Sequence, residues 1–170
     1  MGYYVNGNGE LRIKKENLDK AYEALMALQD APNKAKRGGS SGGGEAPRFW
    51  YSWMPEDLRT LPDTKAVFAE LGFEVDSDEN GDLLIRCYDN KTGQEEVFFA
   101  AAAPFIEEGE YEWQGEDGEF WKWTFHDGKM WLHTGTRAYT HASPVEALAL
   151  LEQERRMVES MEAQIASMKK

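Results

Sequence analysis

Apolar residues at the start of the chain form two short alternating runs and then a helical stripe. The two runs flank the stretch Asn-Gly-Asn-Gly at residues 6–9, and their members are Tyr3, Val5, Leu11 and Ile13. Because Asn-Gly pairs tolerate positive φ angles, this pattern predicts a β-hairpin. The next apolar positions recur at helical spacing, at Leu18, Tyr22, Leu25 and Leu28. They predict a helix over about residues 16–29 and complete a first region, residues 1–30.

The second region, residues 31–47, has a different composition. It is rich in Gly, Pro and Ser, which predicts a flexible linker or a long surface loop. Two basic residues precede its first glycines, in the order Lys36, Arg37, Gly38, Gly39 and Ser40. Backbone N–H groups in such a loop could hold a phosphate, but no Gly-Lys-Ser or Gly-Lys-Thr follows, so the Walker spacing is absent. A linker is the preferred interpretation and a ligand loop is the alternative.

In the third region, residues 48–142, the spacing of apolar residues alternates between that of strands and that of helices. The pattern predicts strands at 49–54, 73–75, 83–87 and 111–113, helices at about 63–71 and 94–105, a turn at Asn80-Gly81 and a loop at 89–93. This β-α-β-β-α-β order is that of ferredoxin-like folds. We therefore expect an α+β fold with a mostly antiparallel sheet and helices on one face, and a ferredoxin-like core with added hairpins is one form of it.

A further hairpin is predicted to turn at Asp127-Gly128. A two-residue turn pairs His126 with Lys129, Phe125 with Met130, Trp123 with Leu132 and Lys122 with His133. Side chains alternate between the two faces of a strand. The core face then receives Trp121, Trp123, Phe125, Met130 and Leu132. The other face receives Lys122, Thr124, His126, Trp131 and His133.

The last region, residues 143–170, has the pattern of one long helix. Ser143-Pro144-Val145-Glu146 matches a capping box with Pro at the first helical position. Apolar residues follow at three- and four-residue spacing, at Leu148, Leu151, Val158, Met161, Ile165 and Met168. Such a helix is about 40 Å long, so we expect part of it to project beyond a small domain. It either folds back over the domain or binds a partner or a second copy.

The negative charge belongs to the third region. Residues 48–142 carry 8 basic and 20 acidic side chains, which accounts for the whole net charge of −12. Its densest acidic run consists of Glu107, Glu108, Glu110, Glu112, Glu116, Asp117 and Glu119. Such a charge repels nucleic acid and anionic membranes and favours a basic protein partner. Solubility is the simpler explanation of the same charge.

No group of residues matches a catalytic or metal site. Residues 76–81 match the start of an EF-hand calcium loop, but its twelfth position holds Cys87 where a bidentate Glu is required. The three histidines, His126, His133 and His141, have no Cys or carboxylate at metal-ligand spacing. We therefore expect no metal, no cofactor and no enzymatic activity.

A cytoplasmic location is expected. The single Cys87 cannot form an internal disulfide, which fits a reducing compartment. The N-terminal stretch has no basic segment followed by an apolar one, as a signal peptide would have. No apolar run approaches the roughly 20 residues that a membrane span needs.

Several stretches resemble a family of small uncharacterised proteins of bacteriophages and prophages. They are MGYYV at 1–5, KENL at 15–18, KRGGS at 36–40, WYSWM at 50–54, LGF at 71–73, YDNKTGQE at 88–95 and WQGEDG at 113–118. The resemblance covers about residues 1–135 and brings no assigned activity. It implies an accessory protein that acts in the cytoplasm of a bacterial host cell.

These observations lead to one hypothesis and two alternatives. The hypothesis is a non-enzymatic phage protein that binds and blocks a host protein, such as a defence or nucleic-acid-handling factor, through its acidic surface. The first alternative is a protein that binds or sequesters a nucleotide through the loop at 36–40. The second is a virion or assembly component that forms oligomers through residues 143–170.

Overall fold

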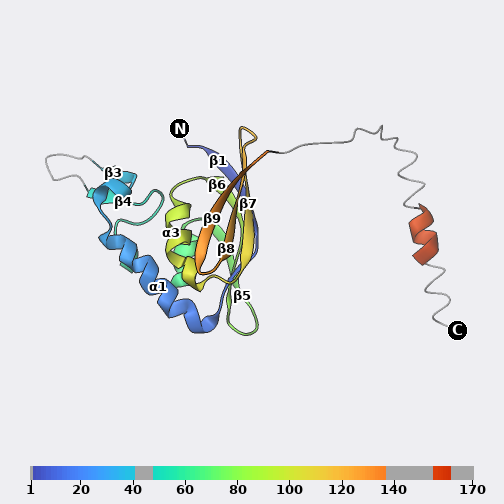
Figure 1. The fold of residues 1–170 in the computed structure, drawn as a ribbon, viewed down its shortest axis with the longest axis horizontal. Coiled ribbons are helices and arrows are strands. Elements are labelled where there is room, and N and C mark those ends of the chain that lie inside the picture. The colour runs from blue at the N-terminus through green and yellow to red at the C-terminus, as the bar shows by residue number, and fades with distance from the viewer. Residues whose placement is uncertain (1, 41–47, 137–154, 162–170) are drawn as a thin grey trace. The chain divides into compact units, whose positions relative to one another are not determined.

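The computed structural model describes residues 2–40, 48–136 and 155–161 (Figure 1). The chain divides into two compact units, Met1–Thr136 and Arg137–Lys170. The first unit is an α+β domain. In the second unit the described residues, 155–161, are helical. The predicted helix over 143–170 otherwise lies outside the described residues.

The domain is built on a seven-stranded sheet in which all the strand pairs are antiparallel. Across the sheet the strands follow the order β5 (Phe73–Ser77), β6 (Leu83–Lys91), β1 (Tyr4–Gly9) with β2 (Leu11–Ile13), β7 (Gly109–Gly115), β8 (Phe120–His126) and β9 (Lys129–Gly135). Strands β1 and β2 both pair with β6, at residues 88–91 and 83–85 respectively. The expected mostly antiparallel sheet is therefore confirmed.

The helices lie on one face of this sheet, as expected (Figure 1). They are α1 (Leu18–Ala27), α2 (Thr64–Glu70) and α3 (Glu95–Ala102), with short 3-10 turns at Lys15–Asn17, Leu28–Asp30, Asn33–Ala35, Leu58–Thr60 and Ala103–Phe105. The Asp63 side chain accepts a hydrogen bond from the Ala66 N–H and caps α2. Just beyond α2, Gly72 adopts a φ of 102°, which glycine accommodates without strain.

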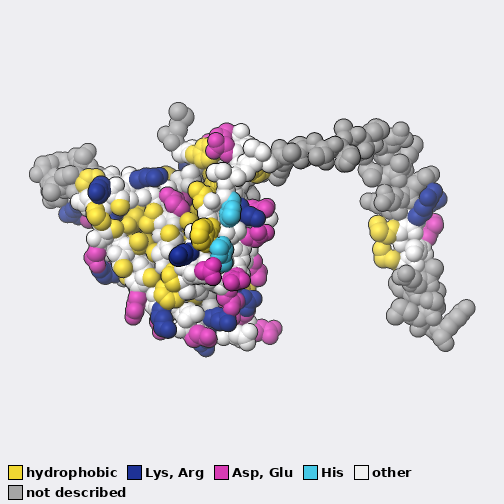
Figure 2. Space-filling view, in the orientation of Figure 1, with side chains coloured by type: hydrophobic (Ala, Val, Ile, Leu, Met, Phe, Trp, Pro, Cys, Tyr) yellow, Lys and Arg dark blue, Asp and Glu magenta, His cyan; other side chains and the backbone are white. Residues whose placement is uncertain are grey.

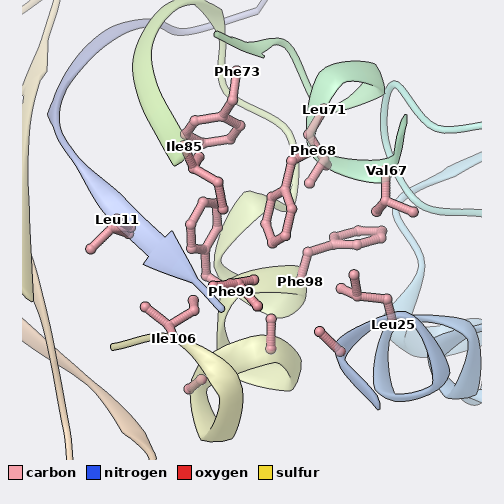
Figure 3. Close-up of a cluster of buried hydrophobic side chains, with 14 of the residues drawn as sticks. Leu11, Leu25, Val67, Phe68, Leu71, Phe73, Ile85, Phe98, Phe99 and Ile106 are labelled. Carbon is pink, nitrogen blue, oxygen red and sulfur yellow. The ribbon is translucent and has the colours of Figure 1, made fainter. Parts of the chain in front are cut away.

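The core fills the space between the helices and the inner sheet face, which is the face turned toward them. Figure 3 shows side chains of α1, α2 and α3 converging on those of β2, β5 and β6. Phe99 of α3 lies at its centre, because its ring is 4.9 Å from the rings of both Phe68 and Phe73 and 5.2 Å from that of Trp123. Aromatic rings from α2, α3 and the sheet therefore share one core.

The predicted N-terminal hairpin is wrong, because residues 6–9 lie inside β1. Their glycines serve ring packing and not a turn. A Cβ atom at Gly7 would lie 2.6 Å from the Tyr111 ring and 2.9 Å from the Trp113 ring, so only glycine lets these rings lie flat on the strand. Two Asn-Gly pairs that are typical of a turn therefore occur in a central strand.

The ferredoxin-like core is not confirmed. Its first strand would be β4 (Arg48–Trp50), which pairs with β3 (Gly38–Ser40) in a separate two-stranded sheet. The loop expected at 89–93 is largely strand, because β6 continues to Lys91 and pairs there with β1. Strand β6 also contains a bulge between Ile85 and Tyr88, so Tyr88 enters the core and Cys87 is exposed.

The hairpin at Asp127-Gly128 has the predicted register throughout. Trp123 and Phe125 are buried, and Trp121 and Met130 pack against the core, as expected. Leu132 does not enter the core, since its exposed fraction is 63%. Strand β9 is the last strand of the sheet, and α3 and the 3-10 turn Ala103–Phe105, which contact it, cover only part of its inner side.

The second region is packed where the structure describes it, which corrects the expectation of a flexible linker for residues 31–40. The buried side chain of Gln94, at the start of α3, holds this region in place. Its Oε1 accepts hydrogen bonds from the N–H groups of Arg37 (2.8 Å) and Ser52 (3.3 Å), and its Nε2 donates one to the Ala35 carbonyl (2.7 Å). One buried amide therefore joins three segments of backbone.

Candidate protein-binding surface

The face of the sheet opposite the helices is the outer sheet face. None of the helices α1, α2 and α3 of the first unit covers it (Figure 1). Its side chains alternate along the strands with those of the core. They are Asn6, Asn8, Asp76, Leu84, Arg86, Asp89, Glu110, Glu112, Gln114, Lys122, Thr124, Trp131 and His133. Figure 2 shows Asp and Glu side chains gathered along the side of the domain that the sheet forms.

Arg12 organises the carboxylates at one end of this face. Its Nη1 lies 2.6 Å from Asp78 Oδ2 and 3.4 Å from Asp82 Oδ2, and its Nε lies 3.8 Å from Glu107 Oε2. Lys14 also reaches Glu107, at 3.0 Å. Two cations are therefore shared among three carboxylates from two different loops.

Arg86 and Lys122 form two further groups of charges. Arg86 Nε lies 3.0 Å from Glu10 Oε2, and its Nη1 lies 3.7 Å from Asp76 Oδ2. Lys122 Nζ lies 2.9 Å from Glu110 Oε2 on the neighbouring strand. Arg12, Arg86 and Lys122 are thus paired with carboxylates of the chain itself, whereas Lys91 and Lys129 of the same face have no ion pair among the described residues. The carboxylates outnumber these cations, so the charge of the face is negative.

The predicted acidic run forms a row along β7. Two of its members precede the strand, two point outward from it and three lie in the turn to β8, in the order Glu107, Glu108, Glu110, Glu112, Glu116, Asp117 and Glu119. Strand β7 is about 20 Å long, so the row does not form a compact cluster. Among the described residues, Glu108, Glu112, Glu116 and Glu119 make no ion pair, and they hold the charge that is not neutralised locally.

The carboxylate of Asp78 stabilises the turn between β5 and β6. Burial alone would raise the pKa of Asp78, but hydrogen bonds from the backbone N–H groups of Asp82 and Asn80, together with Arg12, lower it below its ordinary value. These bonds close the turn between β5 and β6. The residues that resemble a calcium loop therefore build a hairpin turn. In the described part of the chain, no group of three or more His, Cys, Asp or Glu residues is placed to hold a metal ion.

Asp117, in the turn between β7 and β8, accepts a hydrogen bond from the hydroxyl of Tyr3, a residue that packs against the core. This bond raises the pKa of Tyr3 to about 12 and lowers that of Asp117. Gly115 leaves room for the bond, because a Cβ atom there would collide with the Tyr3 hydroxyl. The contact fastens the start of the chain to the turn between β7 and β8.

Two large aromatic side chains are exposed beside these carboxylates. Trp131 is 45% exposed and Tyr4 is 49% exposed. The Trp131 ring stacks on the His126 ring, with centroids 5.1 Å apart and planes 5° apart, and Lys91 Nζ lies 5.3 Å from the centre of the Tyr4 ring. Figure 2 shows histidine and apolar side chains next to each other over β9. The face therefore joins negative charge to apolar contact area.

The histidines have structural neighbours and no catalytic ones among the described residues. His126 lies against Trp131 and has its Nδ1 3.1 Å from Asp127 Oδ2. His133 Nε2 lies 2.9 Å from the Thr124 hydroxyl oxygen across the strands. His141 lies outside the described residues.

The predicted ligand loop at 36–40 has a structural role in its described part. Lys36 is only 9% exposed, and its Nζ donates a hydrogen bond to the Gln29 carbonyl (2.7 Å) and lies 5.9 Å from the Tyr51 ring. Gly38, Gly39 and Ser40 form β3 and pair with β4, and the Arg37 N–H binds Gln94. A hollow of about 730 Å³ adjoins this region. Its basic side chains include Arg48, which lies 3.5 Å from Glu56, and Arg59, which lies 3.3 Å from Asp30.

Two of the predicted helix-interface residues are described. Val158 and Met161 lie on the helical segment 155–161 and are exposed together with Met157. Arg155 Nε lies 3.5 Å from Glu159 Oε1 one turn further along. The other four, Leu148, Leu151, Ile165 and Met168, lie outside the described residues.

The exposure of Trp131 and Tyr4 and the basic partners of the acidic run were not predicted from the sequence. A signal for the first existed, because the hairpin register places Trp131 among polar residues. No local signal existed for the basic partners of Glu107, because Arg12 and Lys14 lie more than 90 residues earlier in the chain. Buried Glu95 was also missed. It accepts hydrogen bonds from the Tyr88 hydroxyl, the Thr92 hydroxyl and the Gly93 N–H.

Among the described residues, none of the helices has both the length and the apolar character needed to cross a bilayer. The likeness to phage proteins stays a prediction, because comparison with known proteins identifies no relative. No protein-family model, no curated protein and no solved structure matches this chain.

Proposed function

We propose that this chain is a non-enzymatic binding protein that occupies a basic surface of another protein with its outer sheet face. One observation carries the proposal. Three cations of the face, Arg12, Arg86 and Lys122, are already paired with the chain's own carboxylates. Among the described residues, Lys91 and Lys129 of this face have no ion pair, but the carboxylates on and beside β7 that have none outnumber them: Glu108, Glu112, Glu116 and Glu119. A basic partner supplies the charge that these carboxylates lack.

The exposed aromatic residues add contact area to this charge. Binding energy at protein interfaces concentrates in a few aromatic and arginine side chains, and charged residues around them steer encounter and set specificity. Trp131 has such a position, because it lies on the same face as Glu110 and Glu112 and is held flat by His126. We assign it as the apolar anchor of the interface.

The resemblance in the sequence suggests the identity of the partner. We propose a protein of a bacterial host cell, which a phage protein in the cytoplasm would block by occupying its basic surface. The predicted helix over 143–170 adds a second proposed interface through its apolar stripe. Enzymatic activity and a bound cofactor are not part of this proposal.

The proposal is tested by capture with a matched pair of variants. The full chain is immobilised and exposed to bacterial lysate at low and at high salt. Glu110→Gln with Glu112→Gln removes two charges from the outer sheet face. The control, Glu23→Gln with Glu70→Gln, removes two exposed charges from α1 and α2 on the other side of the sheet.

The expected result is a captured protein that the control retains, the face variant loses, and high salt releases. The proposal is overturned if no protein is captured at low salt. It is equally overturned if the captured protein binds both variants alike, or if its binding does not depend on salt.

A further inference from the structure

Strand β9 ends the sheet with an open edge. One of its sides pairs with β8, and among the described residues no strand pairs with the other. The two-residue turn makes His126 and Lys129 a hydrogen-bonded pair, so the pattern of an antiparallel ladder alternates from there. The backbone N–H and C=O groups of Met130, Leu132 and Thr134 therefore point away from the sheet.

The opposite edge of the sheet, formed by β5, has features that prevent pairing with another strand, and β9 has fewer of them. Strand β5 carries the carboxylates Glu74 and Asp76, and its pairing with β6 is interrupted by a bulge. Charges and bulges are the usual means by which proteins keep edge strands from pairing. Strand β9 has an unbroken register and no Pro or carboxylate, and its Lys129 lies at the turn, three residues from Leu132. The strand exposes Trp131 on one face and Leu132 on the other.

We propose that β9 is a dimerisation strand, to which β9 of a second copy of this chain pairs in the antiparallel direction. The two-fold axis passes through Leu132. Leu132 then faces the partner's Leu132, and Met130 faces the partner's Thr134, so all outward backbone groups of these residues find a partner. On the outer face Trp131 lies opposite the partner's His133.

A second copy fits this edge for two reasons. First, the outward groups repeat at every second residue on both sides of Leu132, so the edge is complementary to itself under a two-fold rotation. Second, the charge that keeps acidic chains apart is remote from the axis. Glu110 and Glu112 lie two strands away on β7, about 10 Å from the edge, which is about one Debye length at 0.1 M salt.

The contact also removes exposed apolar surface. Leu132, which is 63% exposed in the single chain, becomes covered by its counterpart. The two sheets become one continuous sheet, and the two outer sheet faces lie side by side. This inference is independent of the proposed function, because it concerns the backbone edge and not the carboxylates.

The assembly state of the full chain is measured by sedimentation velocity from micromolar to submillimolar concentration. Leu132→Lys places two like charges on the axis, and since Leu132 contributes little to the core the domain stays folded, as circular dichroism would show. We expect about tenfold or greater weakening of the dimer. The control, Phe49→Lys at the exposed ring of β4, should leave the dimer unchanged.

A crosslinking experiment tests the geometry of the pairing. In a Cys87→Ser background, Leu132→Cys should give a covalent dimer with a short bismaleimide, and Asn8→Cys, three strands away on the same sheet, should not. A chain that is monomeric at all concentrations overturns the proposal. A dimer that withstands Leu132→Lys, or that Asn8→Cys crosslinks equally well, overturns it too.

Discussion

The two faces of the main sheet are built from alternate residues of the same strands, yet they are stabilised by different interactions. The inner sheet face buries aromatic rings such as Tyr111, Trp113 and Trp123, whose contribution depends on apolar area and close packing. The outer sheet face carries ion pairs around Arg12 and Arg86, which solvent and salt weaken. If the proposed function holds, stability of the domain and recognition of a partner lie on opposite sides of one set of strands.

The largest expected effect is on the inner side. Phe99→Ala removes the ring at the centre of the core and should lower the free energy of unfolding by about 3–5 kcal/mol. That is a large part of the roughly 5–15 kcal/mol of a typical domain. Urea unfolding measures it. Phe49→Ala, at an exposed ring of β4, is the control, and an equal loss in both variants would contradict a core centred on Phe99.

Two single substitutions at neighbouring residues of β1 compare the two sheet faces directly. Gly7→Ala places a methyl group against the rings of Tyr111 and Trp113 and should cost about 1–3 kcal/mol. Asn8→Ala, one residue later on the outer sheet face, should stay within about 0.5 kcal/mol. Thermal unfolding of both variants checks the difference. Equal effects would show that β1 does not separate the faces as described.

A smaller effect is expected from the ion pairs, and it should depend on salt. Arg86→Met leaves Glu10 and Asp76 without their cation, so the chain should lose less stability than in Gly7→Ala. The loss should shrink between about 0.1 M and about 1 M NaCl, because the Debye length falls from about 10 Å to about 3 Å. Lys34→Met, at a residue with no ion pair in the described part of the chain, is the control. A salt-independent loss at Arg86 would point to packing and not to charge.

The smallest effect concerns the bond between Tyr3 and Asp117. The folded-state pKa of Asp117 is lowered, so the bond stabilises the fold above the ordinary value of 3.8 and ceases to do so as the pH falls through the lower folded-state pKa. Tyr3→Phe should therefore reduce stability at neutral pH and make the loss in acid shallower. Urea midpoints from pH 7 to pH 2 test this. Parallel curves for both proteins would rule out a contribution of the bond.

Local signals in the sequence predicted a large part of the fold. Gly72 and the Asp63 cap bound α2, and Asp127-Gly128 sets the register of β8 and β9, because each signal acts within a few residues. The position of β1 between β6 and β7 had no such signal. It depends on the rings of Tyr111 and Trp113, which lie about a hundred positions further along the chain. Local sequence does not contain that information, so the Asn-Gly pairs predict a turn.

The candidate surface was predictable to a similar degree. The carboxylates of β7 stand close together in the sequence, so their common position could be expected. Their partial neutralisation could not, because Arg12 and Lys122 come from two other strands, β2 and β8. Likewise, composition alone classed Lys36 as a loop residue, whereas the buried amide of Gln94 holds that segment against α3.

The arrangement of the tryptophans gives each side of the sheet its own optical signal. Trp113 and Trp121 lie with their planes 5° apart at 5.9 Å, and Trp123 lies 4.7 Å from Trp113. Indoles this close couple their electronic transitions, so the near-ultraviolet circular dichroism of this cluster reports the packing of the interior. Trp131 is separate and exposed to water, as is Trp53, so a partner on the outer sheet face should change the fluorescence of Trp131 and leave that of Trp53 as a constant background. Folding can thus be followed by circular dichroism and binding by fluorescence in one unlabelled sample.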